Sequence, residues 1–268
     1  MRAIIKANLK QQYERTMREA YAFARKCAIS GSPIAVLDCG AGDGHELVAT
    51  FNSRTTDPGF RYQGIEWSEA EVCLGHEKGL DIIKSDLNCT LPLADESRDC
   101  IIAYSVLEHL LKPCGFIAEC HRVLRPGGAL VILTPNIATW FTIAQVLMGG
   151  MPSSGPHPDS NWLVASSESV RVSRIQRDDL ATDTPKHRHL VVFSFKVLSR
   201  FLVGTGFAIE ESRGFGYYPF PRRLQRMLER LDPGRCHQMV FLARKTSTQS
   251  FRPTSAGEVS SRGNHPHQ

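Results

Sequence analysis

The chain of 268 residues lacks the long apolar runs of a membrane-spanning protein. No run approaches the roughly eighteen apolar residues that a helix needs to cross a bilayer. The opening residues, MRAIIK, contain no uninterrupted apolar segment of the kind found in secretory signals. We therefore expect a cytoplasmic protein.

Cysteine pairs at metal-binding spacing and a strong charge excess are also missing. Eight cysteines occur, but none stand in a Cys-x-x-Cys arrangement and most lie inside apolar runs. This favours reduced, buried thiols over a disulfide framework or a zinc site. The net charge of +5 is spread along the chain apart from one local cluster, so it does not by itself indicate a nucleic-acid-binding protein.

The two common phosphate-binding patterns are absent, because the chain has neither Gly-x-Gly-x-x-Gly nor a P-loop Lys-Ser/Thr pair. Its glycine-rich stretch, VLDCGAGDGHE at 36–46, places glycines at alternate positions after an apolar run and a carboxylate. We interpret it as a strand, a tight turn and a helix start, because glycine tolerates positive φ and lets a ligand approach the backbone. Asp38 would repel a phosphate there but suits an ammonium group.

Apolar strands alternate with amphipathic helices along most of the chain. Strands are expected at residues 34–38, 60–66, 80–84, 100–104, 129–134, 207–213 and 237–243. Helices are expected at residues 3–28, 113–124, 194–203 and 219–231, and also after the glycine turn and after Glu66. The alternation predicts an α/β fold with right-handed crossovers and a mostly parallel sheet that helices cover on both faces. The glycine turn then lies at the carboxyl edge of the sheet, where such folds bind ligands.

The alternation stops at residues 140–187, where glycine and proline are frequent. We interpret this segment as a cap inserted after the fifth strand. Residues 1–30 are expected to form an N-terminal helix, and residues 1–245 a single domain. Residues 246–268 are rich in Ser, Thr, Gly, Pro and His, which predicts a disordered tail.

Several motifs follow one another in a fixed order. They are DCGAGDG at 38–44, Glu66 at the end of the second strand, SDL at 85–87, LPL at 91–93 with DCII at 99–102, SVLEHL at 105–110 and RVLRPGG at 122–128. In this order they resemble the class I S-adenosylmethionine-dependent methyltransferases, particularly the small-molecule branch that includes the ubiquinone-biosynthesis type (methyltransferase type 11). The resemblance is strong over residues 36–136 and looser over 188–244. It implies a Rossmann-like, doubly wound seven-stranded fold with S-adenosylmethionine as the cofactor.

The resemblance also implies a role for each strand end. Asp38 would face the amino-acid portion of the cofactor, and Glu66 would accept hydrogen bonds from both ribose hydroxyls. Asp86 would accept one from the adenine amino group. The implied cofactor-binding set is Asp38, Gly40, Ala41, Gly42, Glu66, Trp67, Asp86, Leu87, Tyr104 and Ser105, of which the last two would border the sulfonium and the substrate. A single carboxylate at such a place is more often a helix cap, so the prediction depends on the whole set.

Catalysis of methyl transfer from a sulfonium consists mainly of aligning nucleophile and methyl group, and we expect no metal. A general base would help if the acceptor is a hydroxyl, and the candidates are His109, His187 and His189. Each has a structural alternative. His109 could hold its loop by hydrogen bonding, and His187 and His189 could lie on an exposed strand edge.

The acceptor is predicted only by class. Aromatic residues in the cap could cover a small molecule, and we expect a hydroxyl of a saccharide, lipid-linked or secondary-metabolite substrate. Nucleic acid is not expected, because no Asn/Asp-Pro-Pro-Tyr/Phe motif follows the fourth strand. Two alternatives stay open: an accessory protein of the methionine-biosynthesis type acting with an acyltransferase, and a protein that binds S-adenosylmethionine without transferring the methyl group.

The local basic cluster lies at residues 219–235, where arginines surround an amphipathic helix. The cluster is either a solvated face or a contact for an anionic membrane surface or a phosphate-bearing substrate. The sequence carries no signal for the oligomeric state.

Overall fold

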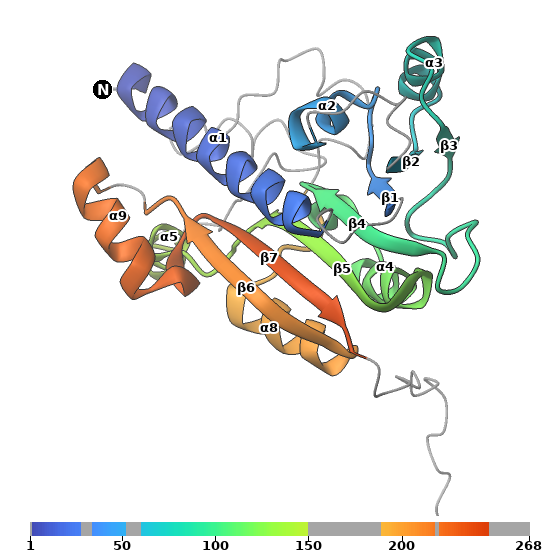
Figure 1. Cartoon of the computed structure of the whole chain (residues 1–268). Helices are drawn as coiled ribbons and strands as arrows, with labels where there is room; N and C mark the ends of the chain where they lie inside the picture. Colours follow the sequence, from blue (N-terminus) through green and yellow to red (C-terminus); the bar gives the residue numbers. More distant parts are fainter. Residues whose placement is uncertain (1, 28–33, 52–59, 150–188, 218–219, 247–268) are drawn as a thin grey trace, which may run out of the picture.

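The computed structural model describes residues 2–27, 34–51, 60–149, 189–217 and 220–246 (Figure 1). Its strands are β1 (Ile34–Cys39), β2 (Phe60–Glu66), β3 (Ile82–Lys84), β4 (Arg98–Tyr104), β5 (Leu124–Pro135), β6 (Phe207–Phe215) and β7 (Gln238–Lys245). Its helices are α1 (Arg2–Cys27), α2 (His45–Phe51), α3 (Glu69–Glu77), α4 (Pro113–Val123), α5 (Trp140–Leu147), α8 (Phe195–Gly204) and α9 (Arg222–Leu231). Two short 3-10 helices are η1 (Leu107–His109) and η4 (Pro233–Arg235).

The strands form one seven-stranded sheet in the order β3-β2-β1-β4-β5-β7-β6. Strands β1 to β5 pair in parallel, and β7 runs antiparallel to both of its neighbours. The predicted mostly parallel, seven-stranded α/β sheet is therefore confirmed. Because β1 lies between β2 and β4, the turn after β1 is flanked by the carboxyl ends of both strands.

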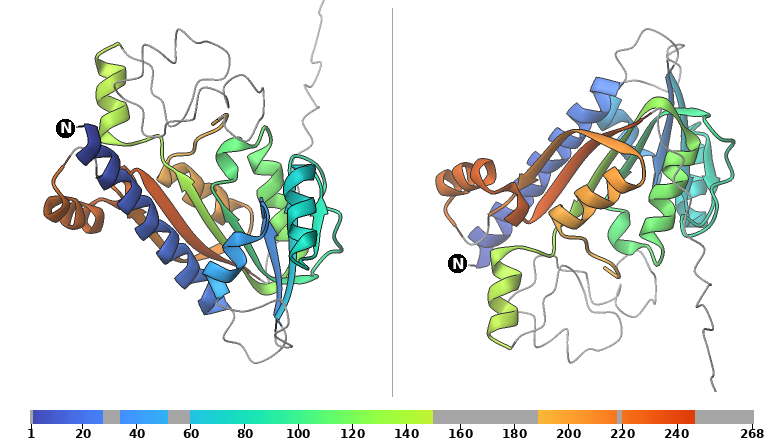
Figure 2. Two further views of the ribbon diagram at one scale, coloured as in Figure 1. Left: turned by 90° about the horizontal axis from the view of Figure 1, so that it is seen from above. Right: turned by 90° about the horizontal axis from the view of Figure 1, so that it is seen from below.

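Helices cover both faces of the sheet, as Figure 2 shows for α1 on one side and α4 and α8 on the other. Alternate residues of the central strands supply the two faces. Val36 and Cys100 pack with Phe23 of α1, whereas Leu37 and Ile101 belong to the cluster formed with α4 and α8. Each central strand is thus apolar on both faces, which accounts for the continuous apolar runs in the sequence.

Several predicted boundaries differ from the structure, among them those of β5, α9 and the cap. Strand β5 begins at Leu124 instead of residue 129, because Leu124 already pairs with Arg98 before a register shift. Helix α9 begins at Arg222, after Pro221, which is its N-cap. The first eight residues of the predicted cap form α5, whose start is fixed by reciprocal hydrogen bonds between Thr139 and Thr142. Residues 150–187 of the cap and 247–268 of the tail lie outside the described residues.

Two further expectations concern the burial of the thiols and the lack of a membrane-spanning helix. All eight cysteines are free; five are buried, and Cys73, Cys89 and Cys114 are exposed. The prediction of buried thiols is therefore right for five of them and wrong for these three. Within the described ranges, no helix is both long and apolar enough to cross a membrane.

Candidate active site

The glycine turn after β1 brings bare backbone to the carboxyl edge of the sheet. The N–H groups of Gly40 and Ala41 both donate to the Ile65 carbonyl of β2, at 2.8 and 3.1 Å. Gly40 has a φ of +77°, and a Cβ on it would lie 2.6 Å from a Val106 methyl group. Gly42 has a φ of +55°, but the nearest neighbour of a Cβ there would be the His45 ring at 3.9 Å. The backbone is thus tightly packed at Gly40 and open to a ligand at Gly42.

Glu66, the last residue of β2, is hydrogen-bonded to this turn. Its Oε2 accepts from the Gly42 N–H at 2.9 Å, and its Oε1 accepts from the N–H groups of Trp67 and Ser68, both at 2.9 Å. A carboxylate has about four acceptor sites, so roughly one stays available beside the turn. Glu66 therefore binds the two residues that lead into α3 and also lies beside the backbone of Gly42. Trp67 itself is exposed.

Asp38 is buried at the end of β1, where its Oδ2 accepts a hydrogen bond from the Tyr62 hydroxyl at 3.0 Å. Burial raises the pKa of this carboxyl to about 7, against the opposing effect of the Tyr62 hydrogen bond. A cation placed beside Asp38 would favour its ionised form and restore an ordinary pKa. Its environment therefore fits the predicted ammonium partner.

Asp86 and Leu87 follow β3, next to the end of β2. The Ser85 N–H donates to the Glu66 carbonyl at 3.0 Å, which ties the two strand ends together. The Asp86 Oδ1 accepts from the backbone and side-chain nitrogens of Asn88, at 2.8 and 2.9 Å. Its Oδ2 has no hydrogen-bond partner within the part of the chain that the structure describes. Leu87 is buried.

Tyr104 is the last residue of β4, Ser105 follows it, and both side chains contact α1. The Tyr104 ring packs edge-to-face on Tyr21 of α1 at 5.8 Å, and its hydroxyl donates to the Ala20 carbonyl at 3.3 Å. Ser105 has a φ of +53°, a conformation that is costly for a residue with a Cβ and is found at functional sites. Its side chain is hydrogen-bonded to Tyr13, so α1 reaches over the end of β4.

The structure brings together two of the predicted histidines. The rings of His109, in η1, and His189 lie edge-to-face with centroids 5.0 Å apart. The Leu190 N–H donates to the Glu108 carbonyl at 2.6 Å, which anchors the segment of His189 to η1. His187 lies outside the described residues.

Glu108 is a third member of this group that the sequence reasoning missed. It is buried, accepts a hydrogen bond from the Thr134 hydroxyl at 2.9 Å, and has its pKa raised to about 7 by burial. Its position beside His109 in the SVLEHL motif was the available signal. The ligand atoms of Glu108, His109 and His189 lie within 4.8 Å of one another. Such a set can exchange a proton near neutral pH or hold a divalent cation.

Comparison with known proteins matches the same part of the chain. Residues 37–132 match a family model described as a methyltransferase domain. A probable S-adenosylmethionine-dependent methyltransferase of Mycolicibacterium smegmatis is 36% identical over 121 residues, which cover 44% of this chain and 42% of that protein. A phthiotriol/phenolphthiotriol dimycocerosates methyltransferase of Mycobacterium ulcerans is 33% identical over 120 residues, 42% of each chain. The chain thus spans less than half the length of these curated relatives.

A solved structure extends the likeness to most of the fold. The geranyl diphosphate C-methyltransferase of Streptomyces coelicolor superposes with a TM-score of 0.52 at 12% identity, covering 84% of this chain and 79% of that one. At this identity the match concerns the fold alone. The family match at residues 37–132 runs from β1 into β5 and contains the glycine turn, Glu66, Asp86 and His109.

Proposed function

We propose that the protein transfers a methyl group from S-adenosylmethionine to a small-molecule acceptor, a proposal supported by the match of residues 37–132 to the methyltransferase-domain model. The observation that carries the proposal is the 2.9 Å hydrogen bond from the Gly42 N–H to the Glu66 carboxylate. It places an acidic strand end directly beside backbone that has room for a ligand.

The residues of the turn fit the parts of this cofactor. Asp38 would hold the amino group, since it is buried and lacks a cationic partner among the described residues. Glu66 would accept from the ribose, with one site available and a second if the Gly42 N–H turns to the ligand. The second oxygen of Asp86 would accept from the adenine amino group. When bound, the cofactor supplies an electrophilic methyl group on a sulfonium.

The acceptor end of the site would lie beyond Ser105. We assign the base to the His109–His189 pair, with Glu108 as a buried group that positions it, and the acceptor to a hydroxyl-bearing saccharide, lipid-linked or secondary metabolite. A base beside the hydroxyl would take its proton and so strengthen the oxygen as a nucleophile toward the methyl group, with S-adenosylhomocysteine as the leaving group. The main contribution of the chain is to hold the two reactants in line.

Titration calorimetry with S-adenosylmethionine tests the cofactor assignment directly. The wild-type chain should bind, and Glu66→Gln should bind at least about tenfold more weakly, because it loses charge-assisted hydrogen bonds to the ribose. Glu69→Gln, an exposed carboxylate of α3 outside the turn, is the matched control and should bind like the wild type. Equal affinity of all three chains would reject the assignment of Glu66.

Turnover is measured as S-adenosylhomocysteine formed with a panel of phenols, sugars and prenols. For an active acceptor, alanine at the histidine that acts as base should cost about 100-fold or more in kcat at saturating cofactor. His76→Ala on α3, whose ring contacts the Ile82 carbonyl, is the control. Full activity of both His109→Ala and His189→Ala would remove the base from the proposal.

Two further results would redirect the proposal. Loss of turnover with a chelator, restored by added Mn²⁺ or Zn²⁺, would assign Glu108, His109 and His189 to a metal and overturn both the base and the expected metal-free site. Retained binding without S-adenosylhomocysteine from any acceptor would favour the accessory or binding-only alternatives.

A further inference from the structure

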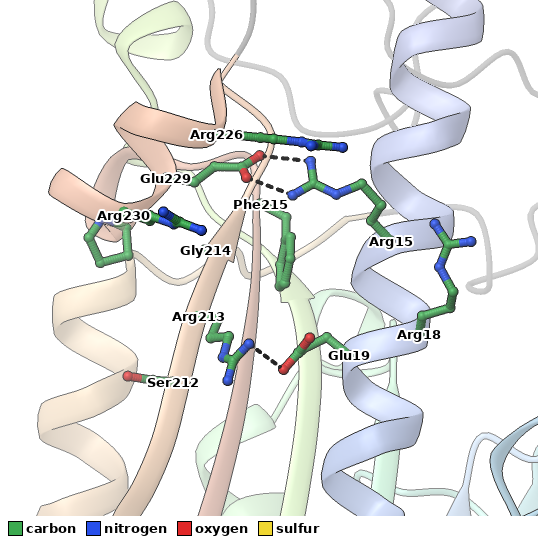
Figure 3. A pocket seen from close by; sticks show the side chains of 11 residues that line it. Arg15, Arg18, Glu19, Ser212, Arg213, Gly214, Phe215, Arg226, Glu229 and Arg230 are labelled. Atoms are coloured by element: carbon green, nitrogen blue, oxygen red, sulfur yellow. Dashed lines mark hydrogen bonds and ion pairs between the residues drawn. The ribbon is translucent and has the colours of Figure 1, made fainter. Parts of the chain in front are cut away.

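A cavity lies at the other end of the sheet from the glycine turn. It has a volume of about 710 Å³ and opens between α1, β6 and α9 (Figure 3). Strand β6 is an edge of the sheet, four positions from β1 in the strand order. The cavity therefore belongs to different elements from the candidate active site, and α1 is the helix that contributes to both.

Arginine dominates the lining of this cavity. It is lined by Arg15, Arg18, Glu19, Ser212, Arg213, Gly214, Phe215, Arg226, Glu229, Arg230 and Pro233, and we call it the arginine pocket. Five guanidinium groups thus face two carboxylates. Two of the guanidinium groups come from α1, near the start of the chain, and three from β6 and α9, near its end. In Figure 3 the Arg18 side chain lies on the opposite side of the α1 ribbon from Arg15.

The two carboxylates are already paired. Glu229 receives two hydrogen bonds from Arg15, at 2.8 and 3.3 Å, and Arg213 lies 2.8 Å from Glu19. Arg18, Arg226 and Arg230 have no carboxylate within ion-pairing distance among the residues the structure describes. Three cations thus share one cavity without a counter-charge. All three are exposed, so solvent screens their mutual repulsion, and a bound anion would lower it further.

The inner wall of the pocket is rigidly built. Glu229 is buried and also accepts the Gly216 N–H at 2.9 Å, so its carboxylate is fixed from two sides. The Arg15 guanidinium lies over the buried Phe215 ring, 5.5 Å from its centroid. The pocket consequently offers a flat, partly apolar surface next to a cluster of fork-shaped donors. Guanidinium groups match phosphate oxygens in geometry, with two parallel hydrogen bonds from each.

We propose that the arginine pocket binds a phosphate group, carried by a soluble organic phosphate or by a phospholipid headgroup. Arg226 and Arg230 contact the phosphate oxygens, Arg18 adds positive charge on the α1 side of the pocket, and Arg15 and Phe215 pack against the organic part. The volume is that of a typical small-molecule site. Arg226 and Arg230 of the pocket belong to the basic cluster at residues 219–235. For that cluster the sequence left open a solvated face, or a contact with an anionic membrane surface or a phosphate-bearing substrate.

Isothermal titration of the full chain with pyrophosphate at low salt tests the soluble source. Arg226→Gln and Arg18→Gln should each weaken pyrophosphate binding about five- to tenfold, because each removes one positive charge from the pocket lining. Arg223→Gln is the matched control, since Arg223 is also exposed on α9 but does not line the pocket. It removes the same charge and should change the affinity less than about twofold.

Co-sedimentation with vesicles tests the lipid source, with phosphatidic acid in neutral lipid against neutral lipid alone. Binding to the vesicles that is sensitive to Arg226→Gln and not to Arg223→Gln assigns the headgroup; pyrophosphate binding without vesicle binding assigns a soluble phosphate. Equal weakening by all three variants, or no binding to either probe, overturns the proposal. The same variants are also titrated with S-adenosylmethionine, and their affinity for it should stay unchanged. This measurement distinguishes a failure of the arginine-pocket proposal from a failure of the methyl-transfer proposal.

Discussion

Gly40 and Gly42 have the same left-handed backbone but different surroundings. A side chain at Gly40 would collide with Val106, whereas a Cβ at Gly42 would meet only the His45 ring, at ordinary van der Waals distance. Gly40 is therefore needed for packing of the turn against the segment after β4. Gly42 leaves the backbone of the turn accessible to a ligand.

Alanine substitutions should separate these two roles. Gly40→Ala should lower the free energy of unfolding by about 2–4 kcal/mol, from backbone strain plus a close contact. Gly42→Ala should cost only about 1–2 kcal/mol from strain, yet weaken S-adenosylmethionine binding by about tenfold or more, since its methyl group occupies the approach to the backbone. Urea unfolding and calorimetry measure the two effects. Unchanged cofactor affinity in Gly42→Ala would contradict a ligand at this turn.

Single residues were predictable where their place in a strand is fixed by local pattern. Asp38 and Glu66 were found because an apolar strand ends at each of them. Glu108 was missed because its burial comes from packing between η1, Thr134 of β5 and the segment of His189, which no local pattern shows. Tyr104 was placed at the correct strand end, but its side chain turns to α1.

At the scale of elements, α1 and α9 are joined by buried polar contacts across more than two hundred residues of sequence. Gln12 donates to Gln225, and Arg15 pairs with Glu229. The Glu229 side chain is only 7% exposed, and that of Arg15 is 26% exposed. A pair of this kind fixes the position of α9, although the sequence pattern indicated only a basic amphipathic helix.

Breaking the pair should destabilise the docking of α9. Glu229→Gln should lower the free energy of unfolding by about 2–4 kcal/mol, because Arg15 keeps a charge without its partner. Arg15→Gln with Glu229→Gln should recover part of this loss, and a double-mutant cycle measures the coupling. The exposed pair Lys84–Glu69 is the control, where a coupling below about 0.5 kcal/mol is expected. Equal coupling in the two pairs would argue against the buried contact.

At the scale of the whole molecule, two buried carboxyl groups make stability depend on pH. Asp38 and Glu108 both have their pKa raised to about 7 by burial. Between their ordinary pKa values and pH 7, the folded chain holds protons that the unfolded chain has released. The folded state is therefore favoured at low pH and loses this advantage as the pH rises through 7.

Urea unfolding at pH 5 and pH 8 should show this loss. Relative to Asp38→Asn or Glu108→Gln, the wild type should lose roughly 2–3 kcal/mol at most for each group over this interval. Burial lowers the pKa of His237 to about 4, which has the opposite effect on stability below the ordinary pKa of histidine. Wild type and variants share this group, so its effect cancels when they are compared. Identical pH dependence in wild type and variants would mean that these carboxyl groups titrate normally.

The overall α/β architecture followed from the sequence because each strand and helix is signalled within about ten residues. The position of β7 did not follow in the same way. Its pairing with β5 and β6 depends on which apolar edge is open once the other strands are placed, and that is a property of the assembled sheet. The arginine pocket is likewise a product of assembly, because its cations come from both ends of the chain.

The position of β7 also sets an order of events during synthesis. Strand β6 pairs only with β7 in the described sheet, and β7 leaves the ribosome after every other described strand. Strands β1 to β5 can pair as soon as they emerge, whereas β6 waits for residues 238–245 before it has an edge to join. A nascent chain can therefore complete the glycine turn well before the arginine pocket exists.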